Sequence, residues 1–192
     1  MENMALKAFK ESIRAKEKFF IKTNVQRLAK CAELVSTAFT SGHKLMIAGN
    51  GGSAADAQHV AAEFVNRFMI ERPPLPAIAL TTDSSILTSV GNDYDFSLSF
   101  SKQVAALGKE GDVLLAISTS GGSQNVIKAA EDAKKKGITV IALTGKDGGK
   151  LAKKADIVLN VPVESTPRIQ ETHILVLHIL CEQIDHLLFK KG

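Results

Sequence analysis

The fold is decided by the stretch from residue 113 to residue 144, VLLAISTSGGSQNVIKAAEDAKKKGITVIALT. It begins with a run of strand type at Val113–Ser118, continues into a helical stretch at Ser123–Lys136, and ends in a second run of strand type at Thr139–Thr144. Both runs are apolar almost throughout, which is typical of strands covered on both faces. This order predicts two parallel strands joined by a right-handed helical crossover.

The same alternation extends in both directions along the chain. Runs of strand type are expected at residues 44–48, 77–81, 113–118, 139–144 and 157–161. Helical stretches are expected at residues 53–68, 84–90, 96–107, 123–136, 148–153 and 167–189. These patterns predict an α/β fold in which a five-stranded parallel sheet lies between two layers of helices.

An additional helical segment precedes the first expected strand. The first forty residues contain no Pro or Gly, and apolar residues recur in them at helical spacing until Ser41-Gly42. The pattern predicts one long helix or two, outside the main repeat, so we divide the chain into a helical arm at 1–42 and a single α/β domain at 43–192. A helix with an apolar stripe needs a surface to bury against, and a sister subunit is the expected partner.

Composition fits a single globular domain. The chain has 192 residues, of which 45% are hydrophobic and 23% are charged, and its formal net charge is +4. The densest basic run, Lys134–Lys136, stands just before Gly137, where lysines complement the end of a helix. No aromatic platform accompanies this run, so nucleic-acid binding is not expected.

Nothing in the sequence predicts export or membrane insertion. The N-terminus lacks the apolar core of a signal peptide, and no run reaches about 18 apolar residues. The two cysteines, Cys31 and Cys181, lie far apart in apolar helical patterns and have no zinc or redox spacing. We expect them to be buried free thiols in a reducing compartment, and the protein to be cytoplasmic.

The turn at Ser118–Ser123 has the composition of a phosphate-binding loop. It holds four hydroxyl side chains and two glycines, and it connects a strand to a helix whose N-terminus presents free N–H groups. It contains no Lys, so it is not a nucleotide P-loop. It suits a phosphate monoester held by neutral donors. The alternative is a polar turn in which Ser123 is merely the helix N-cap.

A second turn of similar chemistry follows the first expected strand. In Asn50-Gly51-Gly52-Ser53, the last residue has capping-box spacing to Asp56. Alone this turn is weak evidence, because many strand-to-helix turns are built in this way. Both turns nevertheless fall at the carboxyl ends of parallel strands, where α/β sheets bind ligands.

The helix after Ser53 carries an unexpected polar stripe. His59 and Glu63 are four residues apart and share one face, which Asp56 and Arg67 continue. The rest of this helix is mainly Ala, Val and Phe, so the stripe is expected to line a cavity or an interface. The alternative is an exposed row in which Glu63 pairs with Arg67.

The last helix repeats this feature. Gln170 and His178 lie on one broad face, about 12 Å apart along the axis, and His178 is surrounded in sequence by apolar residues. A lone histidine there is more often a hydrogen-bonded core residue. Together with His59 and Glu63, however, these two side chains form a donor set suited to one divalent metal, zinc by preference. We expect the nearby His173 and Glu171 to have supporting or structural roles.

These motifs together resemble those of the sedoheptulose-7-phosphate isomerase (phosphoheptose isomerase) family, in the sugar isomerase (SIS) domain superfamily. The resemblance rests on Gly-Asn-Gly-Gly-Ser at 49–53 with His59 and Glu63, Ile-Ser-Thr-Ser-Gly at 117–121, Leu-Thr-Gly-Lys-Asp-Gly-Gly at 143–149, and Arg-Ile-Gln-Glu at 168–171 with His178. It covers essentially the whole chain. Each motif alone is common, but the combination is specific.

The resemblance implies a flavodoxin-like fold, a homotetramer and one zinc ion per subunit. It implies conversion of sedoheptulose 7-phosphate to D-glycero-D-manno-heptose 7-phosphate through an enediol, which supplies heptose for lipopolysaccharide. The family's zinc ligands fall on His59, Glu63, Gln170 and His178. Its substrate contacts fall on Asn50, Gly51, Gly52, Glu63, Asn92, Asp93, Ser118, Thr119, Ser120, Ser123 and Gln170. Its catalytic acid–base pair matches Glu63 and His178.

One position departs from the family pattern. Many relatives carry Asp just before Arg-Ile-Gln, where this chain has Pro167. The sequence leaves open whether this acidic contact is absent or is supplied by Glu164.

Two other functions are compatible with much of the chain. A tetrameric replication-initiation factor of the same superfamily, which binds the DnaA initiator, shares the pattern of residues 66–68, 71–73 and 76–83. That relative lacks the acid–base pair that Glu63 and His178 provide here, which favours the isomerase. The other alternative is a protein that isomerises or senses a different phosphosugar.

Overall fold

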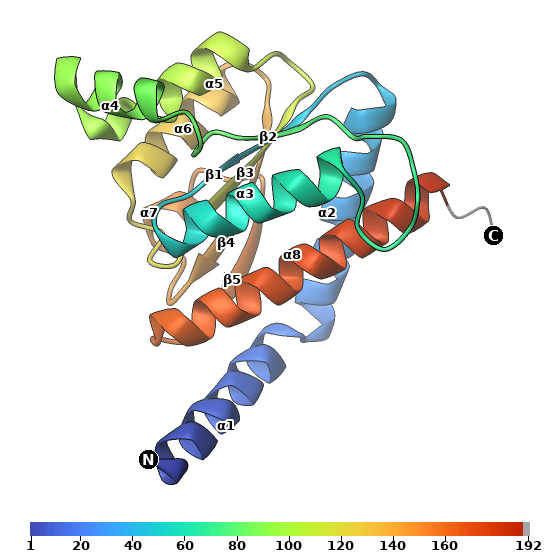
Figure 1. Ribbon diagram of the computed structural model, residues 1–192, viewed down its shortest axis with the longest axis vertical. Coiled ribbons are helices and arrows are strands. Elements are labelled where there is room, and N and C mark those ends of the chain that lie inside the picture. Colours follow the sequence, from blue (N-terminus) through green and yellow to red (C-terminus); the bar gives the residue numbers. More distant parts are fainter. Residues whose placement is uncertain (190–192) are drawn as a thin grey trace.

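The structure, a computed structural model, describes residues 1–189 and has an α/β architecture (Figure 1). The strands are β1 (Leu45–Ala48), β2 (Ala77–Ala79), β3 (Val113–Ser118), β4 (Thr139–Gly145) and β5 (Ile157–Val161). The helices are α1 (Glu2–Phe19), α2 (Lys22–Thr40), α3 (Gly52–Val65), α4 (Ser84–Asp93), the short 3-10 helix η1 (Phe96–Leu98), α5 (Ser101–Leu107), α6 (Gln124–Lys135), α7 (Gly149–Ala152) and α8 (Thr166–Phe189).

The strands form one parallel sheet in the order β2-β1-β3-β4-β5. The register aligns Leu45 of β1 with Val113 of β3, and Val113 with Thr139 of β4. This order is that of flavodoxin-like folds, in which the direction of winding reverses between β1 and β3. The predicted three-layer fold with a five-stranded parallel sheet is confirmed.

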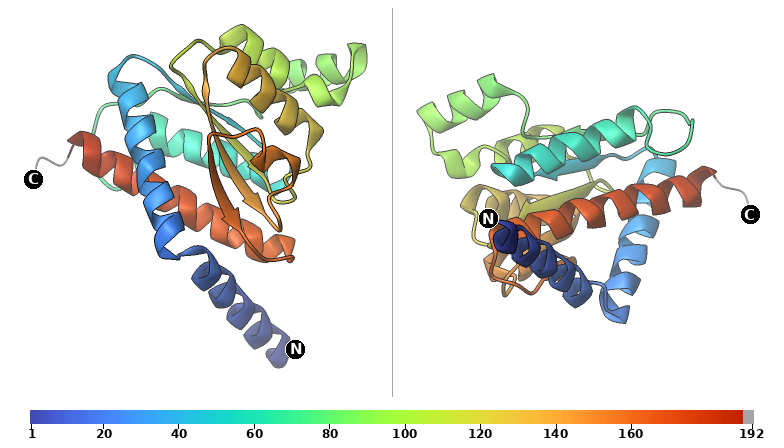
Figure 2. Two further views of the ribbon diagram at one scale, coloured as in Figure 1. Left: turned by 180° about the vertical axis from the view of Figure 1, so that it is seen from behind. Right: turned by 60° about the horizontal axis from the view of Figure 1, so that its bottom comes forward.

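Alternate residues of each strand feed two separate hydrophobic cores. Leu115 and Ile117 of β3 face a core made with α2, α3 and α8, whereas Leu114 and Ala116 face a core made with α5, α6 and α7. Figure 2 shows the sheet from behind, with the helical layers on its two faces. Burial of the strands on both faces explains why their sequences are apolar throughout.

The N-terminal arm consists of two helices with different environments. Helix α2 packs into the main core through Leu28, Cys31 and Val35, whose side chains are buried. Helix α1 extends away from the sheet (Figures 1 and 2), and it exposes Leu6 and Phe9. The amide of Asn24 donates to the carbonyl of Phe19 where the two helices meet. The division at residue 42 remains a prediction.

The structure corrects two local expectations. Residues 96–107 are not one helix, because η1 ends at Leu98 and α5 starts at Ser101. Ser53 is not an N-cap, because α3 starts at Gly52 and Gly51 occupies the cap position with a positive φ of 54°. Among residues 1–189, no helix combines the length and the apolar character needed to cross a membrane.

Candidate active site

Two loops meet at the carboxyl ends of β1 and β3. Asn50 follows β1, and Asn125 lies in the first turn of α6 after β3. Their side-chain amides are reciprocally hydrogen-bonded, with Nδ2–Oδ1 distances of 2.8 and 2.9 Å. Asn125 is buried and is also 3.4 Å from the Ser99 hydroxyl. This amide pair fixes the two loops together at the point where such sheets bind ligands.

The hydroxyls of the loop at Ser118–Ser123 are organised among themselves. Ser123 occupies the N-cap position of α6, but its side chain makes no cap hydrogen bond, and its Oγ lies 3.0 Å from Oγ of Ser118. The N–H of Gly122 donates to Oγ of Ser120. The hydroxyl of Ser123 is therefore not used as an ordinary helix cap. The loop keeps its hydroxyls beside the N-terminus of a 12-residue helix, as an anion site requires.

The same loop packs directly on the loop that follows β4. Gly121 has a φ of +60°, and a Cβ placed there would lie 1.9 Å from the carbonyl oxygen of Gly148. The carbonyl of Gly121 accepts a hydrogen bond from the N–H of Leu151 in α7. Backbone therefore touches backbone at this contact, which explains why a glycine is required.

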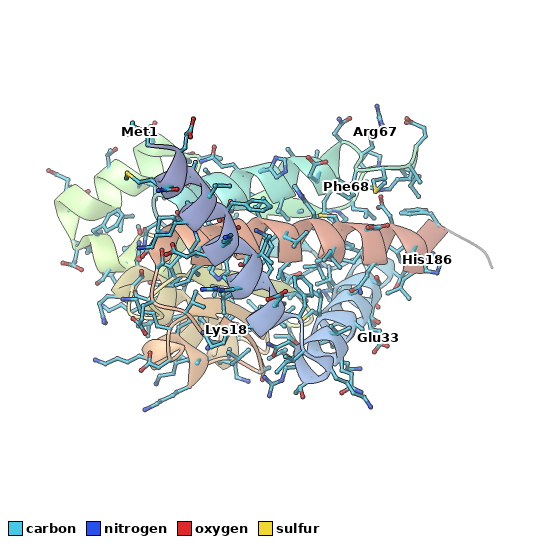
Figure 3. All side chains as sticks on the ribbon, turned by 90° about the horizontal axis from the view of Figure 1, so that it is seen from below. Met1, Lys18, Glu33, Arg67, Phe68 and His186 are labelled. Carbon is cyan, nitrogen blue, oxygen red and sulfur yellow. The ribbon has the colours of Figure 1, made fainter. Side chains whose placement is uncertain are left out.

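Three of the candidate functional side chains meet between α3 and α8. Nε2 of His59 lies 2.8 Å from Nε2 of His178 and 3.4 Å from Oε1 of Glu63. The ring of Phe68 stacks on His178 at a centroid distance of 5.5 Å. Figure 3 shows Phe68 and Arg67 where α3 ends beside the C-terminal half of α8. The structure therefore brings His59, Glu63 and His178 together, and their catalytic and metal-binding roles remain predictions.

The alternative considered for the stripe on α3, an ion pair between Glu63 and Arg67, does not form. Arg67 pairs with Glu71 at 3.6 Å, whereas the neighbour of Glu63 is His59. Asp56 lies one turn before His59, and its buried Oδ2 has no hydrogen-bond partner among the residues that the structure describes. Burial raises the pKa of Asp56 to about 6, and the nearby His59 partly opposes this shift. Along the stripe, Glu63 and Asp56 are half-buried, whereas His59 and Arg67 are exposed.

Other predicted residues lie apart from this cluster. The amide of Gln170 lies against Gly52, where a Cβ would come within 2.3 Å of its Nε2. Gly52 precedes His59 by about 10 Å along α3, so Gln170 reaches the start of that helix. Asn92 and Asp93 lie at the exposed end of α4 and are hydrogen-bonded to each other at 2.8 Å. Their roles remain predictions.

The structure also places the residues near Pro167, the position that departs from the family pattern. Glu164 is exposed and lies 3.7 Å from Lys146. His173 is fully buried and its Nε2 lies 2.9 Å from the carbonyl oxygen of Thr144. Burial lowers the pKa of His173 to about 4, which keeps the ring neutral. His173 is therefore a structural residue that connects α8 to the end of β4, as expected.

The cluster has the donors that zinc prefers. Two imidazole nitrogens and one carboxylate converge from His59, His178 and Glu63, which are typical zinc ligands. In the described part of the chain, no group of three or more His, Cys, Asp and Glu side chains already has the spacing to hold a metal ion. The two Nε2 atoms are within hydrogen-bonding distance, so the rings would have to separate slightly. The residue types fit a metal, and zinc remains a prediction.

Two residues that the sequence did not single out for the site support it. Asn125 ties the loops together, as described above. Arg72, in the segment that follows α3, is buried, and its Nη2 donates to the backbone carbonyl of Glu63 at 2.8 Å. Both act through contacts with distant parts of the chain, which local periodicity does not reveal.

Comparison with known proteins identifies the family of this chain. The model of the SIS domain family matches residues 8–145. The chain is 55% identical over 190 residues to phosphoheptose isomerase of Thermodesulfovibrio yellowstonii, covering 99% of this chain and 94% of that protein. It is 47% identical over 193 residues to that of Sulfurimonas denitrificans, covering 100% of this chain and 99% of that protein.

Solved structures give the same result. The phosphoheptose isomerase of Neisseria gonorrhoeae superposes with a TM-score of 0.90 at 50% identity, covering 96% of this chain and 98% of that one. That of Francisella tularensis superposes with a TM-score of 0.91 at 43% identity, covering 96% and 97%.

Proposed function

The chain belongs to the SIS domain family and, within it, to the phosphoheptose isomerases, and from this we propose that it converts sedoheptulose 7-phosphate into D-glycero-D-manno-heptose 7-phosphate. The protein is thus an aldose–ketose isomerase. The comparisons favour this function over the replication-initiation factor considered from the sequence. The observation that carries the proposal is the meeting of Glu63 and His178 with His59 between α3 and α8.

Isomerisation of a ketose to an aldose needs a proton to leave C1 and a proton to arrive at C2. In our proposal the Glu63 carboxylate takes the proton from C1, which forms a cis-enediol, and returns it to C2. His178 moves the remaining proton between the oxygens on C1 and C2. A positioned acid or base of this kind contributes about 10²- to 10⁴-fold to the rate.

The substrate phosphate is remote from this chemistry and provides binding energy and alignment. We assign it to Ser118, Thr119, Ser120 and Ser123 at the start of α6, where hydroxyls surround a helix N-terminus. The remaining proposed sugar contacts are Asn50, Gly51, Gly52, Asn92, Asp93 and Gln170. The Asn50–Asn125 pair supports this assignment, because it holds the two loops in a fixed relation.

The same cluster is our proposed zinc site, with His59, Glu63 and His178 as ligands and Gln170 as a fourth. A bound zinc ion would supply Lewis-acid polarisation of the substrate carbonyl. Glu63 then has two proposed roles, as metal ligand and as base. These roles compete, because a carboxylate tightly bound to zinc is a weaker base.

Glu63→Gln separates these roles. We expect turnover to fall by about 10²- to 10⁴-fold, because the amide cannot accept the C1 proton. NMR of the product formed from sedoheptulose 7-phosphate measures turnover, and elemental analysis of the same sample measures zinc. Near-normal turnover would exclude Glu63 as the base, and loss of zinc would support its role as a ligand.

The matched control is Glu71→Gln, which changes an exposed carboxylate just beyond α3. Among residues 1–189, the only ion-pair partner of the exposed Glu71 is Arg67, so this variant should keep both turnover and zinc.

We further propose that the enzyme works as a cytoplasmic homotetramer that supplies heptose for lipopolysaccharide. Support for assembly comes from α1, where Leu6, Phe9 and Ile13 form an exposed apolar stripe with exposed fractions of 56%, 62% and 40%. Such a stripe is stabilised by burial against another surface.

A further inference from the structure

A buried ion pair lies close to the proposed catalytic residues, although neither partner belongs to them. Nε of Arg72 donates to Oδ1 of Asp185 at 2.8 Å, and the two side chains are only 1% and 4% exposed. Arg72 follows α3 in the chain, whereas Asp185 lies on α8. The pair therefore joins the two helices that carry Glu63 and His178.

Arg72 also holds the end of α3 directly. Its Nη2 donates to the carbonyl of Glu63 at 2.8 Å, and its Nη1 donates to the carbonyl of Phe64 at 2.7 Å. These carbonyls lie in the last turn of α3, where the backbone has no further partners within the helix. A cation there is also favoured by the helix dipole. One guanidinium thus contacts the backbone of a proposed catalytic residue.

Asp185, the other partner of the ion pair, lies on the same face of α8 as His178. Asp185 comes seven residues later on α8, which is about two turns, so both side chains lie on the same face. Figure 3 shows this half of α8, where His186 is labelled, beside the end of α3, where Arg67 and Phe68 are labelled. Any slide or rotation of α8 against α3 would change the Arg72–Asp185 contact and the Glu63–His178 separation together.

We propose that Arg72 and Asp185 are positioning residues for the isomerase, which set the separation of Glu63 and His178 by locking α8 against the end of α3. Apolar packing between the helices stabilises their association, but it has little directional preference. A buried ion pair contributes little net stability compared with an apolar pair of similar size. Its directional hydrogen bonds are what fix one arrangement. The inference rests on the proposed function for its activity readout.

The test compares single and double replacements. Asp185→Leu leaves the Arg72 charge buried without its partner, so this variant should lose both thermal stability and activity. The double variant Arg72→Met with Asp185→Leu removes both charges and should recover part of the lost melting temperature. Its kcat should nevertheless stay about 10- to 100-fold below wild type. KM should change little, because the phosphate loop is untouched.

The result that would overturn the inference is recovery of kcat together with the melting temperature in the double variant. That outcome would make the pair purely structural. If the double variant does not fold, Asp185→Asn replaces it as the test, because asparagine keeps the side-chain shape and an acceptor for Arg72. We expect a smaller fall in kcat for this variant, and a kcat equal to wild type would also overturn the inference.

The matched control breaks another largely buried ion pair far from the site. Nζ of Lys44 lies 2.6 Å from the fully buried Asp112, at the opposite end of β1. Lys44→Met should lower the melting temperature without changing kcat.

Failure of the proposed function would be recognised separately, because wild-type protein would then not convert sedoheptulose 7-phosphate. In that case the NMR signals of the His59 and His178 rings decide the inference. They should shift in Asp185→Asn and stay in place in Lys44→Met. Unmoved signals in Asp185→Asn would overturn it.

Discussion

Gly121→Ala tests whether the proposed phosphate-binding loop, Ser118–Ser123, depends on direct backbone contact with the loop that follows β4. Gly121 has a φ of +60°, and a methyl group there would lie 1.9 Å from the carbonyl oxygen of Gly148. The variant should therefore be less stable than wild type and should bind the substrate phosphate more weakly.

The size of the effect follows from two contributions. Holding an L-residue in the left-handed region costs about 1–2 kcal/mol. Moving the Gly148 backbone to relieve the overlap costs about 1–3 kcal/mol. The free energy of unfolding should fall by about 2–5 kcal/mol in total, which for a chain of this length lowers the melting temperature by about 4–20 °C.

Thermal unfolding monitored by circular dichroism measures the stability, and steady-state kinetics measures KM. The matched control is Gly122→Ala, because Gly122 has an ordinary φ and its nearest neighbour, Oγ of Ser120, is 3.4 Å from the added carbon. That change should leave stability equal or slightly higher, since alanine restricts the unfolded chain. Equal melting temperatures for the two variants would refute the reasoning.

Two further predictions concern assembly and pH. Phe9→Asp places a charge in the apolar stripe of α1 and should shift the mass measured by analytical ultracentrifugation from that of the proposed tetramer to smaller species. Lys7→Asp, on another face of α1, should leave the mass unchanged. An unchanged mass in Phe9→Asp would refute assembly through this stripe. His173 has a pKa of about 4 in the folded state and near 6.5 in the unfolded state. Between these two pH values the unfolded state therefore binds more protons than the folded state. The stability that the neutral ring provides above pH 6.5 is accordingly lost as the pH falls towards 4. The free energy of unfolding of wild type should fall by about 2 kcal/mol between pH 6.5 and 5 because of this group. Urea unfolding of His173→Gln should show a pH dependence without this part of the loss. The same pH dependence in both proteins would contradict the role assigned to His173.

The sheet was predictable because its strands are buried on both faces and therefore apolar throughout. The split of residues 96–107 was not, because it depends on local hydrogen bonds. There the Asp95 side chain accepts from the N–H of Ser97 and starts a short 3-10 turn before α5. The helical pattern continues across this turn, so periodicity alone joined the two elements.

The candidate site was predictable where its residues share one helix face, as His59 and Glu63 do. The meeting of His59 with His178 was anticipated only because both stripes were polar on otherwise apolar helices. The contacts of Asn125 and Arg72 were not predicted. Their partners, Asn50 and Asp185, are remote in sequence, and only the folded topology brings them together.

The two hydrophobic cores assign different tasks to the two faces of the sheet. The helices that carry Glu63 and His178 pack on one face, and the helix that begins at the phosphate loop packs on the other. In the proposed mode of binding, a sugar phosphate at the strand ends would span the boundary between them. On this proposal, substitutions inside the first core act on the placement of the acid–base residues, and substitutions inside the second act on the placement of the phosphate anchor. The two functions of the site are thus supported by separate sets of buried residues.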